Sequence, residues 1–197
     1  MKIFNIWDTS NIQVIDPGLK NYINLDPILV PRTSGRTAHG QRVFVQKTHI
    51  VERLMNKLMV PGHRGKKHKL TSYHRTGKAN SSYEVVKKCF KIIEKETGKN
   101  PVEVFVKAVE NAAPREEVTS IEYGGARYSK AVDMSPQRRI DITLKLMVQG
   151  SYSKSFNKKL QIEKALANEI LAAYKIDQTS NAISKKLELE RQADASR

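Results

Sequence analysis

Apolar residues recur at every third or fourth position over much of the chain, which is the period of helices that bury one face. Residues 81–97 are typical: Val86, Cys89 and Ile93 fall on one side, and lysines and glutamates fill the other. Polar residues, prolines and glycines interrupt the pattern between one periodic stretch and the next. We therefore expect six helices, over about residues 48–60, 81–97, 100–113, 136–150, 158–174 and 181–193.

The residues at the expected helix ends follow capping chemistry. Short polar side chains accept hydrogen bonds from the first free N–H groups of a helix, and glycine adopts the left-handed backbone that often ends one. The expected N-caps are Thr48, Ser81 (with Glu84 completing a capping box), Asn100, Ser135 and Ser180. The expected ends are Pro61 with Gly62, Gly98, Pro114 and Gly150.

The period changes after the third expected helix. β-Branched and aromatic residues become frequent there, and Gly124 and Gly125 stand at the centre of the segment. Two adjacent glycines suit a tight turn that needs positive φ, so we expect a β-hairpin with strands over about 117–123 and 126–133. The predicted fold is mainly α, a bundle of about six helices with one protruding β-hairpin arm between the third and fourth helices.

The N-terminal part of the chain shows little periodicity. Prolines and glycines interrupt it, and Trp7 and Tyr22 are its candidate anchors to a core. Its composition favours partial disorder until a partner binds. We expect two parts: an N-terminal extension and basic arm over residues 1–46, and a helical binding domain over residues 47–197 with the hairpin at about 116–134.

Positive charge is the main compositional signal. The net charge is +15 and the isoelectric point is about 9.9. Residues 31–80 hold twelve Lys and Arg against one acid, a net charge of +11, together with all five histidines. Such a balance indicates a polyanionic partner, nucleic acid first and an anionic membrane surface second. No apolar stretch approaches the ~18 residues of a membrane span, and the start lacks the features of an export signal.

Several chemistries are not supported by the sequence. The histidines lack metal-ligand spacing and alternate with Lys and Arg, which disfavours a metal ion. Near Gly77 and Lys78 a phosphate-binding loop would need glycine where Ser72 stands, and Ser or Thr where Ala79 stands. The single cysteine, Cys89, lies among apolar residues and is expected to be a buried hydrophobe. No catalytic constellation is visible, so we expect a binding protein without enzymatic activity, cofactor or metal.

The remaining signal is nucleic-acid binding. The sequence VPGHRGKKHKL places one arginine, three lysines and two glycines after a helix, which allows backbone and cationic groups to approach phosphates closely. The hairpin adds Arg127 and Lys130 beside Tyr123 and Tyr128, whose rings can stack on bases. Three alternatives remain open: a solvated hairpin whose tyrosines pack on the fourth helix, a DNA-binding architectural protein with a minor-groove arm, and an RNA-modifying enzyme.

Four segments carry a resemblance to a known family, and they occur in the same order as in that family. They are KTHIVERLMNKLMVPGHRGKKHKL, NPVEVFVKAVENAAPREEVTSIEYGGARYSKAVDMSPQRRID, KALANEILAAY and KKLELERQADASR. Over roughly residues 30–197 the chain resembles small-subunit ribosomal protein seven, particularly its archaeal and eukaryotic branch. The hairpin motif GGA-x-Y followed by S/P-x-x-RR is the most specific part.

The resemblance implies a ribonucleoprotein of the translation machinery, cytoplasmic and within the ribosome. It implies direct binding of small-subunit rRNA in the head region, whose assembly the family seeds. The arm is then expected near the exit-site tRNA and the mRNA exit path, with a neighbouring small-subunit ribosomal protein against the helical body.

Two sets of candidate contact residues follow from the charge pattern and the resemblance. The expected rRNA-binding residues are Arg32, Arg36, Arg42, Lys47, His63, Arg64, Lys66, Lys67, Lys69, Arg75, Lys78, Arg115, Arg127, Lys130, Arg138 and Arg139. The residues expected near tRNA or mRNA, at the tip of the arm, are Tyr123, Gly124, Gly125, Arg127 and Tyr128.

Overall fold

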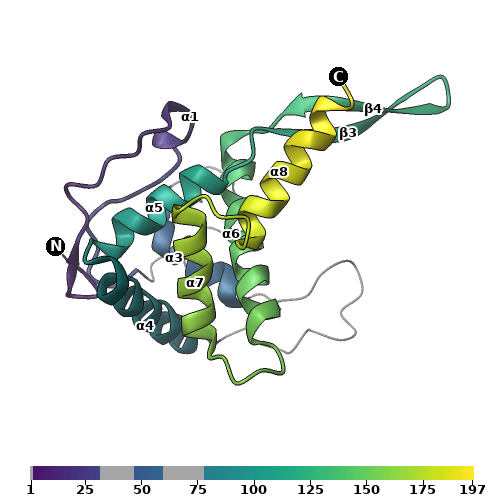
Figure 1. Ribbon diagram of the computed structural model, residues 1–197. Coiled ribbons are helices and arrows are strands. Elements are labelled where there is room, and N and C mark those ends of the chain that lie inside the picture. The colour runs from purple at the N-terminus through teal and green to yellow at the C-terminus, as the bar shows by residue number, and fades with distance from the viewer. Residues whose placement is uncertain (1, 32–46, 60–77) are drawn as a thin grey trace.

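In the part of the chain that the structure describes, six amphipathic helices pack their apolar faces together, and a two-stranded arm projects from the bundle (Figure 1). The computed structural model describes residues 2–31, 47–59 and 78–197. The helices are α1 (Pro17–Lys20), α3 (Ile50–Met59), α4 (Ala79–Thr97), α5 (Pro101–Ala112), α6 (Pro136–Ser155), α7 (Ile162–Tyr174) and α8 (Asn181–Asp194). The strands are β1 (Lys2–Ile3), β2 (Trp7–Asp8), β3 (Glu116–Tyr123) and β4 (Ala126–Asp133). In these residues no helix is long and apolar enough to cross a bilayer.

The core lies between α7 and the helices around it. α7 packs against α4, α5 and α6, and α3 covers the seam between α4 and α6. Apolar residues of the expected stripes fill this core, and among the largest fully buried side chains are Phe90, Phe105, Ile93, Leu144 and Leu166. The mainly α fold predicted from the periodicity is therefore confirmed.

The arm forms as the sequence predicts. β3 and β4 are antiparallel, with Ile121 opposite Tyr128 and Tyr123 opposite Ala126. The turn uses Gly124 and Gly125 at φ values of 60° and 81°, a conformation that costs other residues energy. The arm leaves the bundle between α5 and α6, with α8 beside its base (Figure 1).

Local signals set some helix ends correctly. The Asn100 side chain accepts a hydrogen bond from the Val102 N–H at 3.0 Å, which caps α5. Gly98 ends α4 in the left-handed conformation, at φ 66°. The expected stop of α3 at Pro61 and Gly62 lies outside the described residues, which include this helix as far as Met59.

Other helix ends differ from the prediction. α3 begins at Ile50, so His49 and not Thr48 stands in the N-cap position. The expected capping box at Ser81 is wrong, because α4 begins two residues earlier, at Ala79. α6 continues through Gly150 to Ser155, and α7 begins at Ile162 rather than near residue 158. The reason at Gly150 is close contact: a Cβ there would stand 2.8 Å from Glu169 Oε1, so this glycine serves helix packing and not helix termination.

Residues 2–31 are irregular for most of their length but contribute to the common core. Ile3, Phe4, Trp7 and Leu19 are each at most 4% exposed. The Trp7 ring meets the Phe90 ring of α4 edge-on, with 5.8 Å between centroids. The anchoring role predicted for Trp7 is thus confirmed, and the hydrophobic core extends across the expected division at residue 46.

Candidate nucleic-acid interface

The predicted rRNA-binding residues fall into two groups. Nine of them lie outside the described residues: Arg32, Arg36, Arg42, His63, Arg64, Lys66, Lys67, Lys69 and Arg75. Their two segments, residues 32–46 and 60–77, hold eight Lys and Arg and no acid, which is more than half of the net charge of +15. The other seven have described positions: Lys47, Lys78, Arg115, Arg127, Lys130, Arg138 and Arg139.

Both basic segments connect to well-packed parts of the bundle. The first leads into Lys47, whose carbonyl accepts a 2.7 Å hydrogen bond from the side chain of Asn24, and then into α3. The second joins α3 to α4 and ends beside Lys78, which is exposed at the first turn of α4. The side chain of Lys78, the N-cap residue, makes no capping hydrogen bond, and its ammonium group adds positive charge to a helix start that already favours anions.

The arm is electrostatically mixed. Glu122 pairs with Arg127 at 3.5 Å, and both side chains are well exposed. Glu117 accepts two 2.6 Å hydrogen bonds from the Arg138 guanidinium, and this contact raises the pKa of Arg138. Two of the predicted rRNA contacts are therefore already paired with carboxylates of the arm, and each would meet phosphate only with its remaining donors.

Strand register divides the side chains of the arm between two faces. Directly paired residues, and residues two positions apart, lie on the same side of a hairpin. Ile121, Tyr123, Tyr128 and Lys130 therefore share one face, whereas the Glu122–Arg127 pair lies on the other. Tyr123 is 82% exposed and Tyr128 is 60% exposed, so the alternative in which these rings pack on the fourth helix is not observed.

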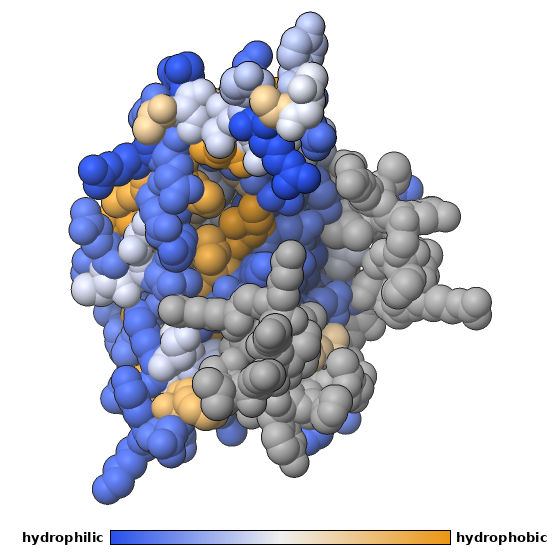
Figure 2. All heavy atoms as spheres, turned by 90° about the vertical axis from the view of Figure 1, so that its right-hand side faces the viewer, coloured by the Kyte–Doolittle hydropathy of each residue, from blue (hydrophilic) through white to orange (hydrophobic). Residues whose placement is uncertain are grey.

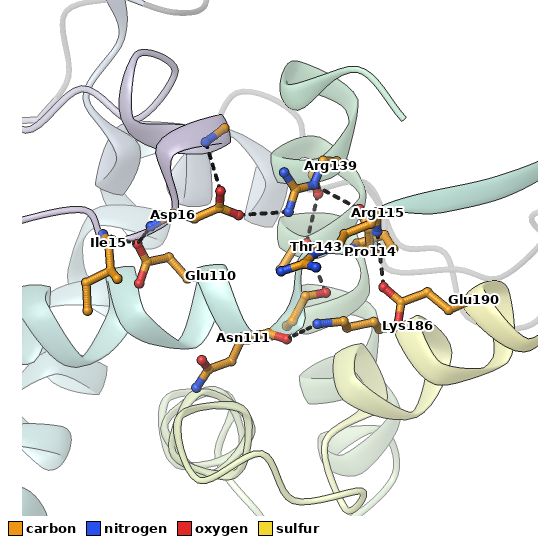
Figure 3. A network of polar contacts seen from close by, with 12 residues as sticks. Ile15, Asp16, Glu110, Asn111, Pro114, Arg115, Arg139, Thr143, Lys186 and Glu190 are labelled. Carbon is orange, nitrogen blue, oxygen red and sulfur yellow. Dashed lines mark hydrogen bonds and ion pairs between the residues drawn. The ribbon is translucent and has the colours of Figure 1, made fainter. Parts of the chain in front are cut away.

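Arg139 points into the protein. Its side chain donates from Nε to the carbonyl of Pro114 at 3.0 Å and from Nη2 to Asp16 Oδ2 at 2.9 Å, and the residue is 8% exposed (Figure 3). Partial burial alone would raise the pKa of Asp16, but hydrogen bonds from Arg139 and the Gly18 N–H outweigh it and lower that pKa. These contacts favour a role for Arg139 in holding the arm.

The sequence prediction did not single out one exposed basic and aromatic loop. Between α6 and α7, Phe156 is 48% exposed and is followed by exposed Lys158 and Lys159. The neighbouring Lys154 is only partly exposed, and its Nζ lies 2.6 Å from the fully buried Glu169. The signal was present in SYSKSFNKK, which has three lysines and no acid, but spacing alone does not separate a lysine that bonds to a buried carboxylate from an exposed one.

The molecular face that carries the arm is largely hydrophilic. Figure 2 shows the arm at the top of this face, with polar and charged residues around a strip of apolar surface. No group of three or more His, Cys, Asp or Glu side chains in residues 2–31, 47–59 and 78–197 is arranged to hold a metal ion. Cys89 is fully buried, as expected, and burial raises the pKa of its thiol.

Comparisons with known proteins agree over nearly the whole chain. A sequence model of the family described as Ribosomal protein S7p/S5e matches residues 20–197. The small ribosomal subunit protein uS7 of Nanoarchaeum equitans is 53% identical over 198 residues, 100% of this chain and 99% of the relative. The protein of the same name from Methanothermobacter thermautotrophicus is 46% identical over 190 residues, 96% of this chain and 95% of the relative. The similarity to the Nanoarchaeum equitans protein includes residues 1–19, which precede the part of the chain that the family model matches.

Proposed function

Because the chain belongs to the ribosomal protein S7p/S5e family, we propose that it enters the small ribosomal subunit by binding small-subunit rRNA directly. It is a structural component of the ribosome in the cytoplasm, and not an enzyme. Its partners are rRNA and other ribosomal proteins. We further propose that this binding seeds assembly of the head region and places the arm near the exit-site tRNA and the mRNA exit path.

The rRNA proposal rests on one observation: positive charge is concentrated in two segments that contain no acidic residue. Residues 32–46 and 60–77 supply eight Lys and Arg without an acid, and they adjoin the two ends of α3. Such a density of like charge is unfavourable in the isolated protein and is relieved by phosphates. The sequence VPGHRGKKHKL is then an rRNA backbone clamp, whose glycines allow close approach.

The arm makes a different kind of contact in this proposal. One face of the arm presents Tyr123, Tyr128 and Lys130, whereas Arg127 and Arg138 are paired with carboxylates. Aromatic rings stack on bases with little regard to sequence, and a single cation nearby meets the backbone. The glycine tip keeps the end of the arm narrow. The loop with Phe156, Lys158 and Lys159 offers the same pairing of ring and cation and is a further candidate contact.

The clamp is tested by replacing Lys66, Lys67 and Lys69 together with alanine. We expect weaker binding to the rRNA head domain and a log–log salt slope smaller in magnitude by about 2, because each lost phosphate contact removes roughly 0.7–0.9. Binding is measured as a salt titration, with random-sequence RNA and duplex DNA as competitors.

The matched control removes the same charge at three exposed lysines: Lys91 and Lys95 of α4, and Lys99 just after the end of that helix. We expect it to bind nearly as the unaltered protein does, with a preference for the head domain of roughly several hundredfold or more. Equal losses in the two triple variants would mean that only net charge matters. A preference that is absent even in the unaltered protein would contradict primary rRNA binding.

A further inference from the structure

The root of the arm is held by side chains from outside the arm. Residues 111–115 comprise the last two residues of α5 and the link to β3, and their backbone groups bond to residues of α6 and α8 (Figure 3). The bonds are Lys186 Nζ to Asn111 O (2.8 Å), Thr143 Oγ1 to Ala112 O (3.3 Å), Arg139 Nε to Pro114 O (3.0 Å) and Arg115 N to Glu190 Oε1 (3.1 Å). A backbone whose polar groups are hydrogen-bonded in this way has few alternative conformations. The direction of the arm is therefore constrained at its base.

Arg139 links the root of the arm to the N-terminal segment. The guanidinium is a planar fork with donors at fixed angles, so two acceptors bonded to different nitrogens restrict its orientation. One acceptor is the carbonyl of Pro114 at the arm root, and the other is the carboxylate of Asp16, 123 residues earlier in the chain. Gly18 allows the approach, because a Cβ there would meet Arg139 Nη1 at 3.2 Å.

Asp16 is itself fixed in place. Its Oδ1 accepts a 2.8 Å hydrogen bond from the Gly18 N–H, and its own N–H donates to Glu110 Oε1 of α5 at 3.0 Å. The N–H of Ile15 donates to the same oxygen at 2.6 Å. The carboxylate that faces Arg139 is therefore held against α5 and is not a mobile surface group.

We propose that Asp16 and Arg139 are positioning residues, through which the N-terminal segment sets the direction of the β-hairpin arm. The ion pair fixes the Arg139 fork, and the fork fixes the carbonyl from which the arm departs. A preset direction lowers the ordering entropy lost when the arm meets its partner. That benefit, though not the positioning itself, rests on the proposed function of the arm as an RNA contact.

The sharpest test variant is Asp16→Asn. The amide oxygen can still accept from the Gly18 N–H, but an NH₂ group then faces the Arg139 donor, so the link to the arm is lost while the local turn is kept. The matched control is Asp141→Asn on α6, two residues after Arg139. Asp141 pairs with the buried Arg53 at 3.5 Å and with Lys57 at 3.3 Å, and neither partner belongs to the arm root.

The direction of the arm is measured in the isolated full-length protein. Spin labels at Ser129→Cys on the arm and Asn168→Cys on α7, both exposed positions, report the distance between them by pulsed electron resonance. The native Cys89 is fully buried and does not compete for label. Amide hydrogen exchange at Met134, whose N–H bonds to Arg115 O at 2.9 Å, reports opening at the root.

We expect Asp16→Asn to replace a narrow label distance with a broad one and to speed exchange at Met134 roughly tenfold, as loss of one charge-assisted hydrogen bond would. Asp141→Asn is expected to lower stability without either change. Equal behaviour of the two variants, or an unchanged label distance in Asp16→Asn, would overturn the proposal.

A second variant serves if Asp16→Asn does not fold. Arg139→Lys keeps the charge beside Asp16 but lacks the fork, so its ammonium cannot reproduce both bonds in the same geometry. We expect the same broadening of the label distance, and a narrow distance in this variant would contradict the inference. Binding of each variant to the rRNA head domain separates the two proposals: a displaced arm with unchanged rRNA affinity leaves the positioning intact and counts against the arm as an RNA contact.

Discussion

His49 shows how burial changes the chemistry of a single residue. It is fully buried beside the start of α3, where its Nδ1 accepts a 3.2 Å hydrogen bond from the Val51 N–H. Burial lowers the pKa of His49 to about 4, although the charges of Glu52 and Asp26 oppose that shift. The accepting Nδ1 indicates that the ring is neutral and acts as a cap for α3.

The predicted consequence is a loss of stability in mild acid. The unfolded chain takes up a proton near pH 6.5 and the folded chain only near pH 4, so protons favour the unfolded state between these values. Protonation of His49 does not affect stability at pH 7. As the pH drops to 4, it lowers the free energy of unfolding by roughly 2–3 kcal/mol.

Urea unfolding at several pH values checks this expectation, with His49→Asn as the matched variant. Asparagine is a good N-cap and does not titrate, so its profile is expected to be flatter between pH 6.5 and 4.5. Parallel profiles for the two proteins would contradict the assignment.

At the scale of elements, Gly150 shows how helix packing overrides a local signal. It lies within α6, where glycine is disfavoured relative to alanine, yet α7 and α8 approach it closely. A Cβ at this position would stand 2.7 Å from the Cβ of Asn181 and 2.8 Å from Glu169 Oε1. Glu169 in turn accepts bonds from Ser180 and Lys154, so the contact lies at the junction of three helices.

We therefore predict that Gly150→Ala destabilises the protein by about 1–3 kcal/mol, although helix propensity alone favours alanine by about 1 kcal/mol. Chemical denaturation measures the difference. Gly98→Ala is the comparison, because no atom lies within 4 Å of the place its new methyl group would take, and only the left-handed backbone, at φ 66°, is strained. A stabilising effect of Gly150→Ala would mean that α8 is free to move away from α6.

At the scale of the whole molecule, the N-terminal segment and the helical body share one core. Ile3, Phe4 and Trp7 belong to the same hydrophobic core as Phe90 of α4, and the rings of Phe4 and Trp7 contact the Phe90 ring. Complete burial of each such side chain contributes about 1.5–3 kcal/mol, and together they are comparable with the net stability of a domain, about 5–15 kcal/mol. We therefore expect residues 2–31 to be ordered without RNA.

Trp7 is the single tryptophan and reports directly on that segment. In urea, its fluorescence and the far-ultraviolet circular dichroism of the helices are expected to change in one coincident transition. Phe4→Ala is expected to lower the free energy of unfolding by about 3–5 kcal/mol, and both probes should report the same decrease. A fluorescence transition at lower urea than the helical one would instead support an independent extension ending near residue 46.

Periodicity, turn chemistry and charge were sufficient to predict the helices from α3 onward, the β3–β4 arm and the class of partner, but not β1, β2 and α1 of the N-terminal segment. These signals act over a few residues, so Asn100, Gly98 and the Gly124–Gly125 turn behave as their neighbours in sequence dictate. The family likewise followed from contiguous motifs.

Only the tertiary structure decided which polar residues face inward. Arg139 and Lys154 look like surface cations in the sequence, but each meets a carboxylate brought from elsewhere in the chain, from 123 and 15 residues away. The burial of Trp7 against Phe90 and the close contact at Gly150 also depend on elements that meet only in the folded chain. Pairing and close packing are properties of distances in space, and no local pattern encodes them.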